Sequence, residues 1–315
     1  MIAWQPSASI ACLRERAQCL VDIRDFFNSR GYLEVETPVM ARFGVTDIYL
    51  QNILATFRGQ QYALQTSPEY HMKRLLAAGS GPIFQVARVF RDDELGRWHN
   101  PEFTLLEWYQ LNVDHLTLLE EVDVLLQRIL NCDALEIKTY QQAFIEACEL
   151  DPFDAQRSTL KETLARFELD NVLPADETCR DQYLFLLMSH VVEPSFASST
   201  VPIAVIDFPE SQASLAQIKQ GVASRFEVYY KGVELANGFH ELIDPDAQAL
   251  RFNADCDARR LKGLPESLPD EFLLAALRHG LPACSGVALG FDRLFALAKG
   301  ETSLSKILSF DFSRS

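Results

Sequence analysis

The sequence contains no long apolar run, and its cysteines do not fall in the pairs that bind metals. No apolar segment approaches the roughly 18 residues that a membrane-spanning helix needs. The seven cysteines are odd in number and scattered, without a Cys-x-x-Cys pair, so a disulfide framework and a zinc site are both disfavoured. The first residues, MIAWQPSAS before LRER, lack the apolar core of a secretory signal. We therefore expect a cytoplasmic protein with reduced thiols.

Positive charge is also scarce. Lysine and arginine number 29 against 44 acidic residues, which gives a formal net charge of −15. Proteins that grip nucleic acid generally carry a basic surface, because neutralising phosphates supplies much of the affinity. The acidity argues against tRNA as a partner, although it leaves room for a local basic patch.

The sequence has no internal repeats and no Gly/Ser/Pro-rich linker. Its 315 residues, 48% of them hydrophobic, are enough to bury a sizeable core. We therefore predict one domain, residues 1–315, with a mainly helical insertion over residues 112–200. Turns are expected near residues 151–152 and 173–174, and an amphipathic helix over residues 115–130.

A strand, loop and strand over residues 84–111 organise the rest of the chain. Residues 84–90 are rich in β-branched and aromatic side chains, and a second strand pattern begins at Glu102. The loop between them is polar. Alternation on the second strand puts Glu107 on a largely apolar face with Phe103, Leu105, Tyr109 and Leu111. An ionised carboxylate there is costly unless a positive charge meets it.

Two segments before this hairpin show helix signals. An apolar stripe from Leu13 to Phe27 predicts a helix, with Gly31 at the C′ position after it. A short edge strand should follow and end before Pro38. Farther on, Ser67 suits an N-cap and Pro68 a first helical position. From the residues alone, Glu69 in that first turn simply complements the helix dipole.

A second hairpin is predicted around Lys231-Gly232. If Tyr230 pairs with Val233, Glu234 lies opposite Tyr229 and Glu227 becomes its diagonal neighbour. Two carboxylates so placed repel each other unless a cation lies between them, but a solvated face explains the pair equally well. The dipeptide at residues 237–238, Asn-Gly, is expected to turn the chain before Glu241.

The C-terminal part, CSGVALGFDRLFALAKG, predicts a short buried strand with Gly286 and Gly290 at its ends, followed by a helix from about Asp292. Arg293 then lies in the first helical turn, where a cation opposes the helix dipole. This position suggests an anionic partner, although pairing with a nearby acid is as good an explanation for a lone Phe-Asp-Arg.

FRDDELGRWHNPEFTLLEWY resembles motif 2 of the class II aminoacyl-tRNA synthetases, in the variant of the lysyl enzymes. The helix, strand and Pro38 resemble motif 1, and the C-terminal part resembles motif 3. The likeness covers nearly the whole chain and extends to the lysyl-tRNA synthetase paralogues that attach (R)-β-lysine to elongation factor P. The resemblance implies an α/β (α+β type) catalytic fold, with a mostly antiparallel sheet flanked by helices. It also implies an enzyme that uses ATP and Mg²⁺ and forms a homodimer through motif 1.

The resemblance also implies the roles of individual residues. Arg91 and Arg293 would be the catalytic residues, one bridging the substrate carboxylate and the α-phosphate and the other meeting the γ-phosphate. The ATP site would comprise Arg91, Asp92, Asp93, Asn100, Phe103, Glu234, Leu235, Gly290 and Arg293. The amino-acid site would comprise Ser67, Pro68, Glu69, Glu107, Tyr109, Glu241 and Ala288. Glu227 and Glu234 would hold magnesium.

The implied pocket favours a cationic substrate. Glu107, Tyr109 and Glu241 converge by family position, and carboxylates with a tyrosine suit an ammonium group, so the substrate should be lysine-like. Ala288 replaces a glycine of the tRNA-charging lysyl enzymes. Its methyl group could favour a β-amino isomer, although one methyl typically discriminates by only about 1–3 kcal/mol.

The chain departs from the family pattern at two points in the loop. The glutamate of Phe-Arg-x-Glu is here Asp93, so either the loop shifts or Glu94 substitutes for it. Trp98 stands where lysyl enzymes have an arginine, with Arg97 just before it.

The chain resembles only the catalytic part of a lysyl-tRNA synthetase. Together with the acidity, this favours a protein acceptor over tRNA, and we expect ATP-dependent transfer of (R)-β-lysine to a lysine of elongation factor P. The alternatives are a ligase that forms a free amide or charges a minimal tRNA, and a non-catalytic lysine or ATP sensor. The joint presence of Arg91, Glu227, Glu234 and Arg293 disfavours the sensor.

Overall fold

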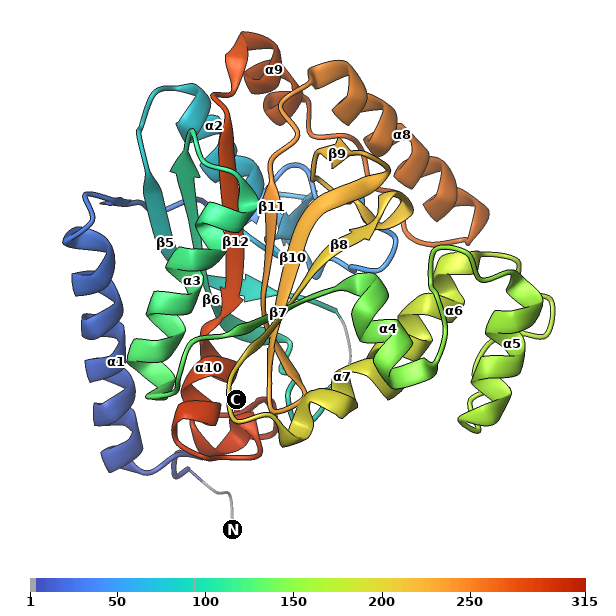
Figure 1. Cartoon of the computed structure of the whole chain (residues 1–315). Coiled ribbons are helices and arrows are strands. Elements are labelled where there is room, and N and C mark those ends of the chain that lie inside the picture. Colours follow the sequence, from blue (N-terminus) through green and yellow to red (C-terminus); the bar gives the residue numbers. More distant parts are fainter. Residues whose placement is uncertain (1–3, 93–94) are drawn as a thin grey trace. The chain divides into compact units, whose positions relative to one another are not determined.

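The computed structural model describes residues 4–92 and 95–315, which fall into two compact units (Figure 1). The first contains the described residues up to Glu121 together with Glu241–Ser315, and the second is Val122–His240. One boundary lies within helix α3, and the other directly follows strand β11. Asp93 and Glu94 lie outside the described residues, so which of them stands in for the glutamate of the family's Phe-Arg-x-Glu stays a prediction.

The first unit has a sheet in the order β1-β5-β6-β12 and a separate three-stranded sheet in the order β2-β4-β3. The long strands pair antiparallel, and only the short edge strand β1 among those described in this unit is parallel to its neighbour. The elements are α1 (Ile10–Asn28), β1 (Leu33–Glu34), β2 (Met40–Ala41), β3 (Leu54–Phe57), β4 (Gln60–Leu64), α2 (Glu69–Ala77), β5 (Ile83–Phe90), β6 (Glu102–Leu111), the start of α3 (His115–Leu130), α8 (Pro245–Leu261), α9 (Glu271–Gly280), β12 (Cys284–Gly290) and α10 (Phe291–Ala298), with 3₁₀ turns at Leu304–Lys306 and Phe312–Arg314.

The central hairpin of this sheet confirms the predicted strand, loop and strand. Strands β5 and β6 pair from Ile83↔Tyr109 to Phe90↔Glu102. Successive side chains point to opposite faces. On one face Phe27 of α1 stacks on Phe84, with ring centroids 4.6 Å apart, and its ring also lies against Trp108. The other face, which carries Glu107, is therefore free of α1 and holds the candidate site described below.

Helix α1 ends as the glycine predicts. Gly31 has a φ of +79°. Its N–H donates to the carbonyl of Asn28, and the N–H of Tyr32 donates to that of Phe27. These two bonds form a Schellman motif, which satisfies carbonyls at the helix end and needs a left-handed residue at C′. The motif directs the chain into β1 at the sheet edge.

The second unit has strands in the order β11-β10-β8-β7, with β9 beside β10. Strand β7, parallel to β8, was not predicted, because its four residues lie within a segment of helical pattern. The elements are the end of α3, β7 (Glu136–Thr139), α4 (Tyr140–Cys148), α5 (Arg157–Arg166), α6 (Arg180–Leu187), a π-helical turn (Met188–Val192), α7 (Glu193–Ser195), a 3₁₀ turn (Phe196–Ser198), β8 (Ile203–Pro209), a 3₁₀ turn (Glu210–Gln212), β9 (Ile218–Lys219), β10 (Val222–Tyr230) and β11 (Val233–His240).

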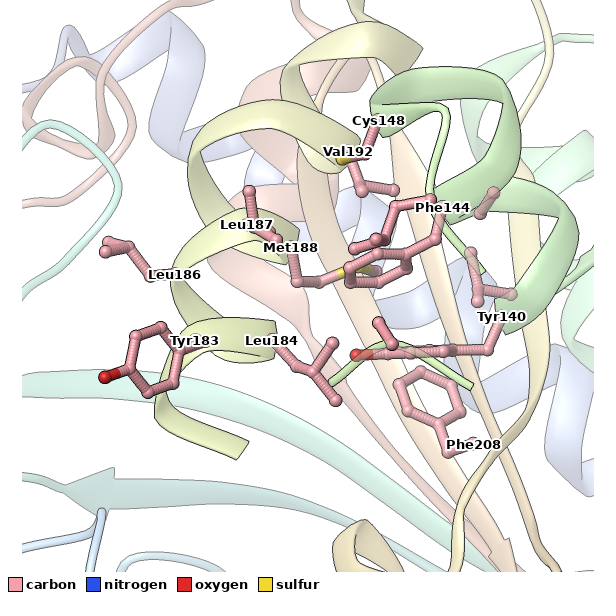
Figure 2. Packing of buried hydrophobic residues seen from close by; sticks show 14 of the residues in the cluster. Tyr140, Phe144, Cys148, Tyr183, Leu184, Leu186, Leu187, Met188, Val192 and Phe208 are labelled. Atoms are coloured by element: carbon pink, nitrogen blue, oxygen red, sulfur yellow. The ribbon is translucent and has the colours of Figure 1, made fainter. Parts of the chain in front are cut away.

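The predicted helical segment packs its own core in this unit (Figure 2). Side chains of α4, of α6 and of the π-helical turn interlock around Phe144 and Met188, and Phe208 of β8 closes the cluster beside Tyr140. The Tyr140 ring stacks on Phe144 at 4.5 Å and lies 5.0 Å from Phe208. The segment is therefore anchored by burial of apolar side chains on strand β8.

The second hairpin forms where predicted, but its register changes after two pairs. Tyr230 pairs with Val233 and Tyr229 with Glu234, as expected. Leu235 is then the extra residue of a β-bulge, so Glu227 lies opposite Asn237. The predicted pairs that place Glu234 opposite Tyr229, two residues from Glu227, are confirmed. The bulge changes only the residue opposite Glu227, which an ideal hairpin would make Ala236.

The prediction of a turn at Asn237-Gly238 was wrong, since both residues continue β11. Gly238 pairs with Phe226, and a β-carbon on Gly238 would lie 2.2 Å from the Phe226 ring. The glycine therefore serves a close approach of the ring to the backbone and not a turn.

We expect Gly238→Ala to destabilise the protein by about 1–3 kcal/mol, because the added methyl overlaps a fully buried ring. Chemical denaturation measures this loss. The control is Gly263→Ala, where a β-carbon would meet no atom within 4 Å and only the positive φ of +66° is strained. A Gly238→Ala variant as stable as the wild type would contradict the packing argument.

Candidate active site

Helix α2 and strand β6 bring Ser67 and Glu107 together on the face of the sheet opposite α1. The Ser67 hydroxyl donates to Oε2 of Glu107 at 2.9 Å, and the Tyr109 hydroxyl donates to Oε1 at 2.8 Å. Ser67 Oγ also accepts from the N–H of Glu69 at 3.0 Å, so it caps the helix as predicted, and Pro68 has helical dihedrals. One serine thus orients both a helix start and a buried carboxylate.

The charged centre of the cluster is Lys73, which the sequence reasoning missed. Its Nζ lies 2.7 Å from Oε1 of Glu69 and 2.5 Å from Oε2 of Glu241. Lys73 is 2% exposed and Glu241 is 1% exposed. The four-residue spacing of Glu69 and Lys73 on one helix was a detectable signal for their pairing, but the contact with Glu241 joins positions far apart in the chain.

The carboxylates of the cluster hold their protons more tightly than usual. Burial, followed by the charge of Glu69, raises the pKa of Glu107 to about 8. Burial raises the pKa of Glu241 to about 7, although Lys73 acts in the opposite direction. Burial alone would lower the pKa of Lys73, but Glu241 and Glu69 outweigh it and raise that pKa. Burial is the largest cause of both raised carboxylate pKa values, and repulsion from Glu69 adds to it.

Strand β12 forms the floor beside these groups. It pairs with β6 so that Gly286 lies opposite Tyr109 and Ala288 lies opposite Glu107. A β-carbon at Gly286 would lie 2.2 Å from the Tyr109 ring and 2.6 Å from Oε1 of Glu241. The absence of a side chain at Gly286 therefore creates the space in which Tyr109 and Glu241 meet. Two residues farther along β12, Ala288 places its methyl group on the same face.

Arg91 and Phe103 lie together at the other end of the hairpin. The guanidinium carbon of Arg91 is 5.1 Å from the Phe103 ring centroid, and the backbone N–H of Arg91 donates to the carbonyl of Pro101. Phe103 is half-buried and packs on the apolar cluster of Ala87, Val89 and Leu105. The site thus offers an aromatic face and a planar cation side by side, which suit a purine and an oxyanion.

The sequence reasoning missed a second residue, Arg259 of α8. It fixes residues 47–51, the segment that accepts a hydrogen bond from Asp92. Its guanidinium donates to the carbonyls of Asp47 and Leu50 and to the side chain of Gln51. The carbonyl of Gln51 in turn accepts from the N–H of Asp92. Arg259 is 2% exposed, so this buried arginine holds the segment on which Asp92 rests.

Arg293 lies at the start of α10, and Asn100 lies in the loop between β5 and β6. Arg293 lies in the first turn of α10, as predicted; its Nε donates to the carbonyl of Trp98 at 3.2 Å and its Nη2 lies 2.9 Å from Nε2 of His99. Asn100 donates to the carbonyl of Glu102 and accepts from the N–H of Phe312. The structure thus shows Asn100 as a support of the loop, while its contact with ATP stays a prediction.

Gly290 ends strand β12 immediately before α10. A β-carbon there would meet the Arg293 side chain no closer than 3.6 Å, an ordinary contact. The backbone at Gly290 is therefore not crowded by the chain itself, as a surface that receives a ligand requires.

The predicted magnesium ligands lie in the second unit. Glu227 is 8% exposed, and its oxygens accept from Arg225 and from the hydroxyl of Tyr229. Burial raises the pKa of Glu227, and the charge of Glu234 raises it further. Two mutually repelling carboxylates fit a hard cation that takes its other oxygens from phosphates and water. Among the described residues, no group of three or more His, Cys, Asp or Glu side chains is arranged to hold a metal ion. A metal here would therefore need the phosphate and water oxygens as further ligands.

A family model of the class II tRNA synthetases (D, K and N) matches residues 2–314. The chain therefore belongs to the class II tRNA synthetase family. Among curated proteins it is similar to the elongation factor P–(R)-β-lysine ligase of Edwardsiella ictaluri (strain 93-146), with 51% identity over 323 aligned residues that cover 100% of this chain and 99% of the relative.

These findings confirm the predicted family, the predicted fold of a mainly antiparallel sheet flanked by helices, and an enzyme of the ligase type. The roles of the individual residues stay predictions, as does the single-domain organisation. No helix among the described residues is long and apolar enough to span a membrane.

Proposed function

We propose that the chain activates (R)-β-lysine as an adenylate and transfers it to a lysine side chain of elongation factor P. The observation that carries the proposal is the buried cluster of Glu69, Glu107 and Glu241, in which three carboxylates gather around a single ammonium, that of Lys73. An amino acid with two ammonium groups would supply the missing cations. The relative's name supports both the amino acid and the acceptor.

The chemistry requires two anions to meet. A carboxylate oxygen of the amino acid attacks the α-phosphorus of ATP; the new acyl–phosphate bond forms as the bond to pyrophosphate breaks. The acceptor amine then attacks the acyl carbon, an amide forms, AMP leaves and a proton passes to solvent. Catalysis of this kind rests mainly on positioning and charge neutralisation. Arg91, with its planar fork, is the residue we assign to both oxyanions, and Phe103 to the adenine ring.

Magnesium would be held by Glu227 and Glu234 together with phosphate oxygens of the nucleotide, and it would neutralise charge on the leaving pyrophosphate. Arg225 would keep Glu227 ionised and oriented, because it bonds the same carboxylate and is itself held by the carbonyl of Gln212 at 2.7 Å. The γ-phosphate contact is assigned to Arg293. A cytoplasmic location stays a prediction from the scattered cysteines and the N-terminal sequence.

Pyrophosphate exchange with α-lysine and (R)-β-lysine side by side, followed by intact-mass analysis of elongation factor P, tests the proposal. We expect exchange with (R)-β-lysine and a mass increase of one β-lysyl group on the acceptor. Exchange without the mass increase would point to a tRNA or a free amide as the product. Failure of exchange with both amino acids would leave only a sensor and refute the proposal.

The raised pKa values predict how ligand binding depends on pH. In the ligand-free protein a carboxylate whose folded pKa exceeds its unfolded value, 4.5 for glutamate, stabilises the fold fully below the unfolded value and loses that contribution as pH rises toward 7 for Glu241 and 8 for Glu107. An ammonium ligand favours the ionised carboxylates. Thermal stabilisation by β-lysine should therefore be larger at about pH 8.5 than at about pH 6.

The matched variants for this measurement are Glu107→Gln, which should flatten the pH dependence, and Glu146→Gln, an exposed glutamate paired with Lys138 that should leave it unchanged. A ligand effect that is constant between the two pH values would show that the buried carboxylates do not meet the ammonium groups.

We also propose a homodimer formed through α1, β1 and the segment up to Pro38. Several large apolar side chains of this region and of the small sheet are exposed, namely Val21, Leu33, Val39, Met40, Leu54 and Phe57. Sedimentation equilibrium at micromolar concentration should give twice the mass of the chain. Replacement of Leu33 and Met40 by glutamate should shift the protein toward monomer, whereas a monomeric wild type would contradict the proposal.

A further inference from the structure

The position of Lys73 between two substrate-binding carboxylates has a consequence for specificity. The resemblance to the lysyl enzymes implies that Glu69 meets the amino group near the reacting carboxylate, and we assign the distal ammonium to Glu241. The Lys73 ammonium contacts both, at 2.7 and 2.5 Å. The ammonium of Lys73 therefore contacts both of the carboxylates to which the two ammonium groups of the substrate would bind.

The uncharged neighbours add nothing to the charge of this cluster. Burial raises the pKa of the Cys284 thiol to about 12 and that of the Tyr109 hydroxyl well above its usual value, so both are neutral. Ser67 is uncharged. Next to burial, the strongest charge acting on Glu107 is that of Glu69, and Glu241 adds to it. The cluster thus contains three carboxylates and one ammonium, and two negative charges are left for a ligand to compensate when all of them are ionised.

We propose that Lys73 is a specificity-determining residue: it fixes the uncompensated charge of the ionised pocket at minus two, so that the pocket takes a diamino acid with two ammonium groups. This inference rests on the proposed function. Amino acids with a single ammonium leave one buried carboxylate unpaired, which costs binding free energy. Without a ligand, protons hold part of this charge, as the raised pKa values of Glu107 and Glu241 express, and the two ammonium groups displace them.

The proposal makes a prediction that a merely structural lysine does not. In Glu241→Gln, Lys73 loses one of its two carboxylate partners. It then pairs with Glu69 alone and competes with the amino group of the substrate for that carboxylate. Removing Lys73 from that variant restores two uncompensated negative charges. The change Lys73→Met should therefore weaken diamino-acid binding in the wild-type background and strengthen it in the Glu241→Gln background.

The test is calorimetric binding of lysine, (R)-β-lysine and norleucine to four proteins: wild type, Lys73→Met, Glu241→Gln and the double variant. We expect Glu241→Gln to lose about 100-fold in affinity for the two diamino acids, and the double variant to regain about tenfold of that loss, as one charge-assisted hydrogen bond is worth. Lys73→Met alone should lose about tenfold at neutral pH. Norleucine, which lacks the distal ammonium, should bind relatively better to Glu241→Gln.

A matched cycle controls for the removal of an ion pair as such. Lys138 and Glu146 form an ion pair in the second unit, and Lys138→Met should change diamino-acid binding by less than about twofold with or without Glu146→Gln. If Lys73→Met alone does not fold, the comparison of Glu241→Gln with the double variant still decides, because both lack the Glu241 carboxylate and differ only at position 73.

The inference is overturned if Lys73→Met lowers affinity in both backgrounds, if it has no effect in either, or if the double variant fails to fold while Glu241→Gln folds. Each result would make Lys73 a structural lysine. Binding is measured without ATP turnover or acceptor, so a failure of the proposed function can be told apart from a failure of the role of Lys73. A wild type that binds no diamino acid refutes the proposed function itself, whereas intact wild-type binding without the sign reversal refutes the role of Lys73 only.

Discussion

Replacement of Arg91 by methionine should lower pyrophosphate exchange by about 10³-fold while the protein remains folded, because a preorganised cation that meets developing charge typically contributes 10²–10³ to the rate. Arg91 is placed for this by the strand end at Phe90, the bond of its N–H to Pro101 and the ring of Phe103. The loss should fall mainly on kcat, since the charge that Arg91 meets is greatest in the transition state.

Two further variants sharpen this expectation. Arg91→Lys should recover only part of the rate, because an ammonium cannot bridge two oxyanions as a planar fork does. Arg88→Met removes an arginine of strand β5, three residues before Arg91, that is half-exposed and lies 3.6 Å from Glu102, and it should retain exchange. Equal losses in Arg91→Met and Arg88→Met would mean that net charge, and not the placement of Arg91, supports the reaction.

The second large effect is expected from Glu241→Gln. The KM for β-lysine should rise by about 100-fold, because a charge-assisted hydrogen bond in a buried site is replaced by a neutral one. The KM for ATP should change by less than about twofold. Lys73 keeps its contact with Glu69 in this variant, so thermal unfolding should remain cooperative. Exchange kinetics with each substrate varied separately measure both constants.

Glu146→Gln is the control for this substitution, since it also removes the carboxylate partner of a lysine but does so at a half-exposed site. Equal rises in the KM values for β-lysine and ATP in Glu241→Gln would show that the pocket is assigned to the wrong ligand. A variant that keeps full selectivity for diamino acids over norleucine would remove Glu241 from the recognition of the distal ammonium.

The predictions that succeeded from sequence concerned local patterns. Strand β5, the start of β6 at Glu102 and helix α3 followed from alternation and helical periodicity. The role of Gly31 followed from the backbone conformation that a helix end requires. Asn237-Gly238 shows the limit of such reasoning, because the same dipeptide that favours a turn lies within a strand when the Phe226 ring needs the space.

The amino-acid sequence by itself therefore determined the central hairpin, the helix start at Ser67 and the family to which the motifs belong, because these depend on neighbours a few residues apart. Only the tertiary structure decided the bulge at Leu235 and the pairing of Lys73 with Glu241, which lies far along the chain. Such contacts depend on how packed elements bury charge, and a buried ammonium is stable only where folding brings its carboxylates to it. Hence the sequence indicated an acidic pocket, and the fold supplied the cation that sets its charge.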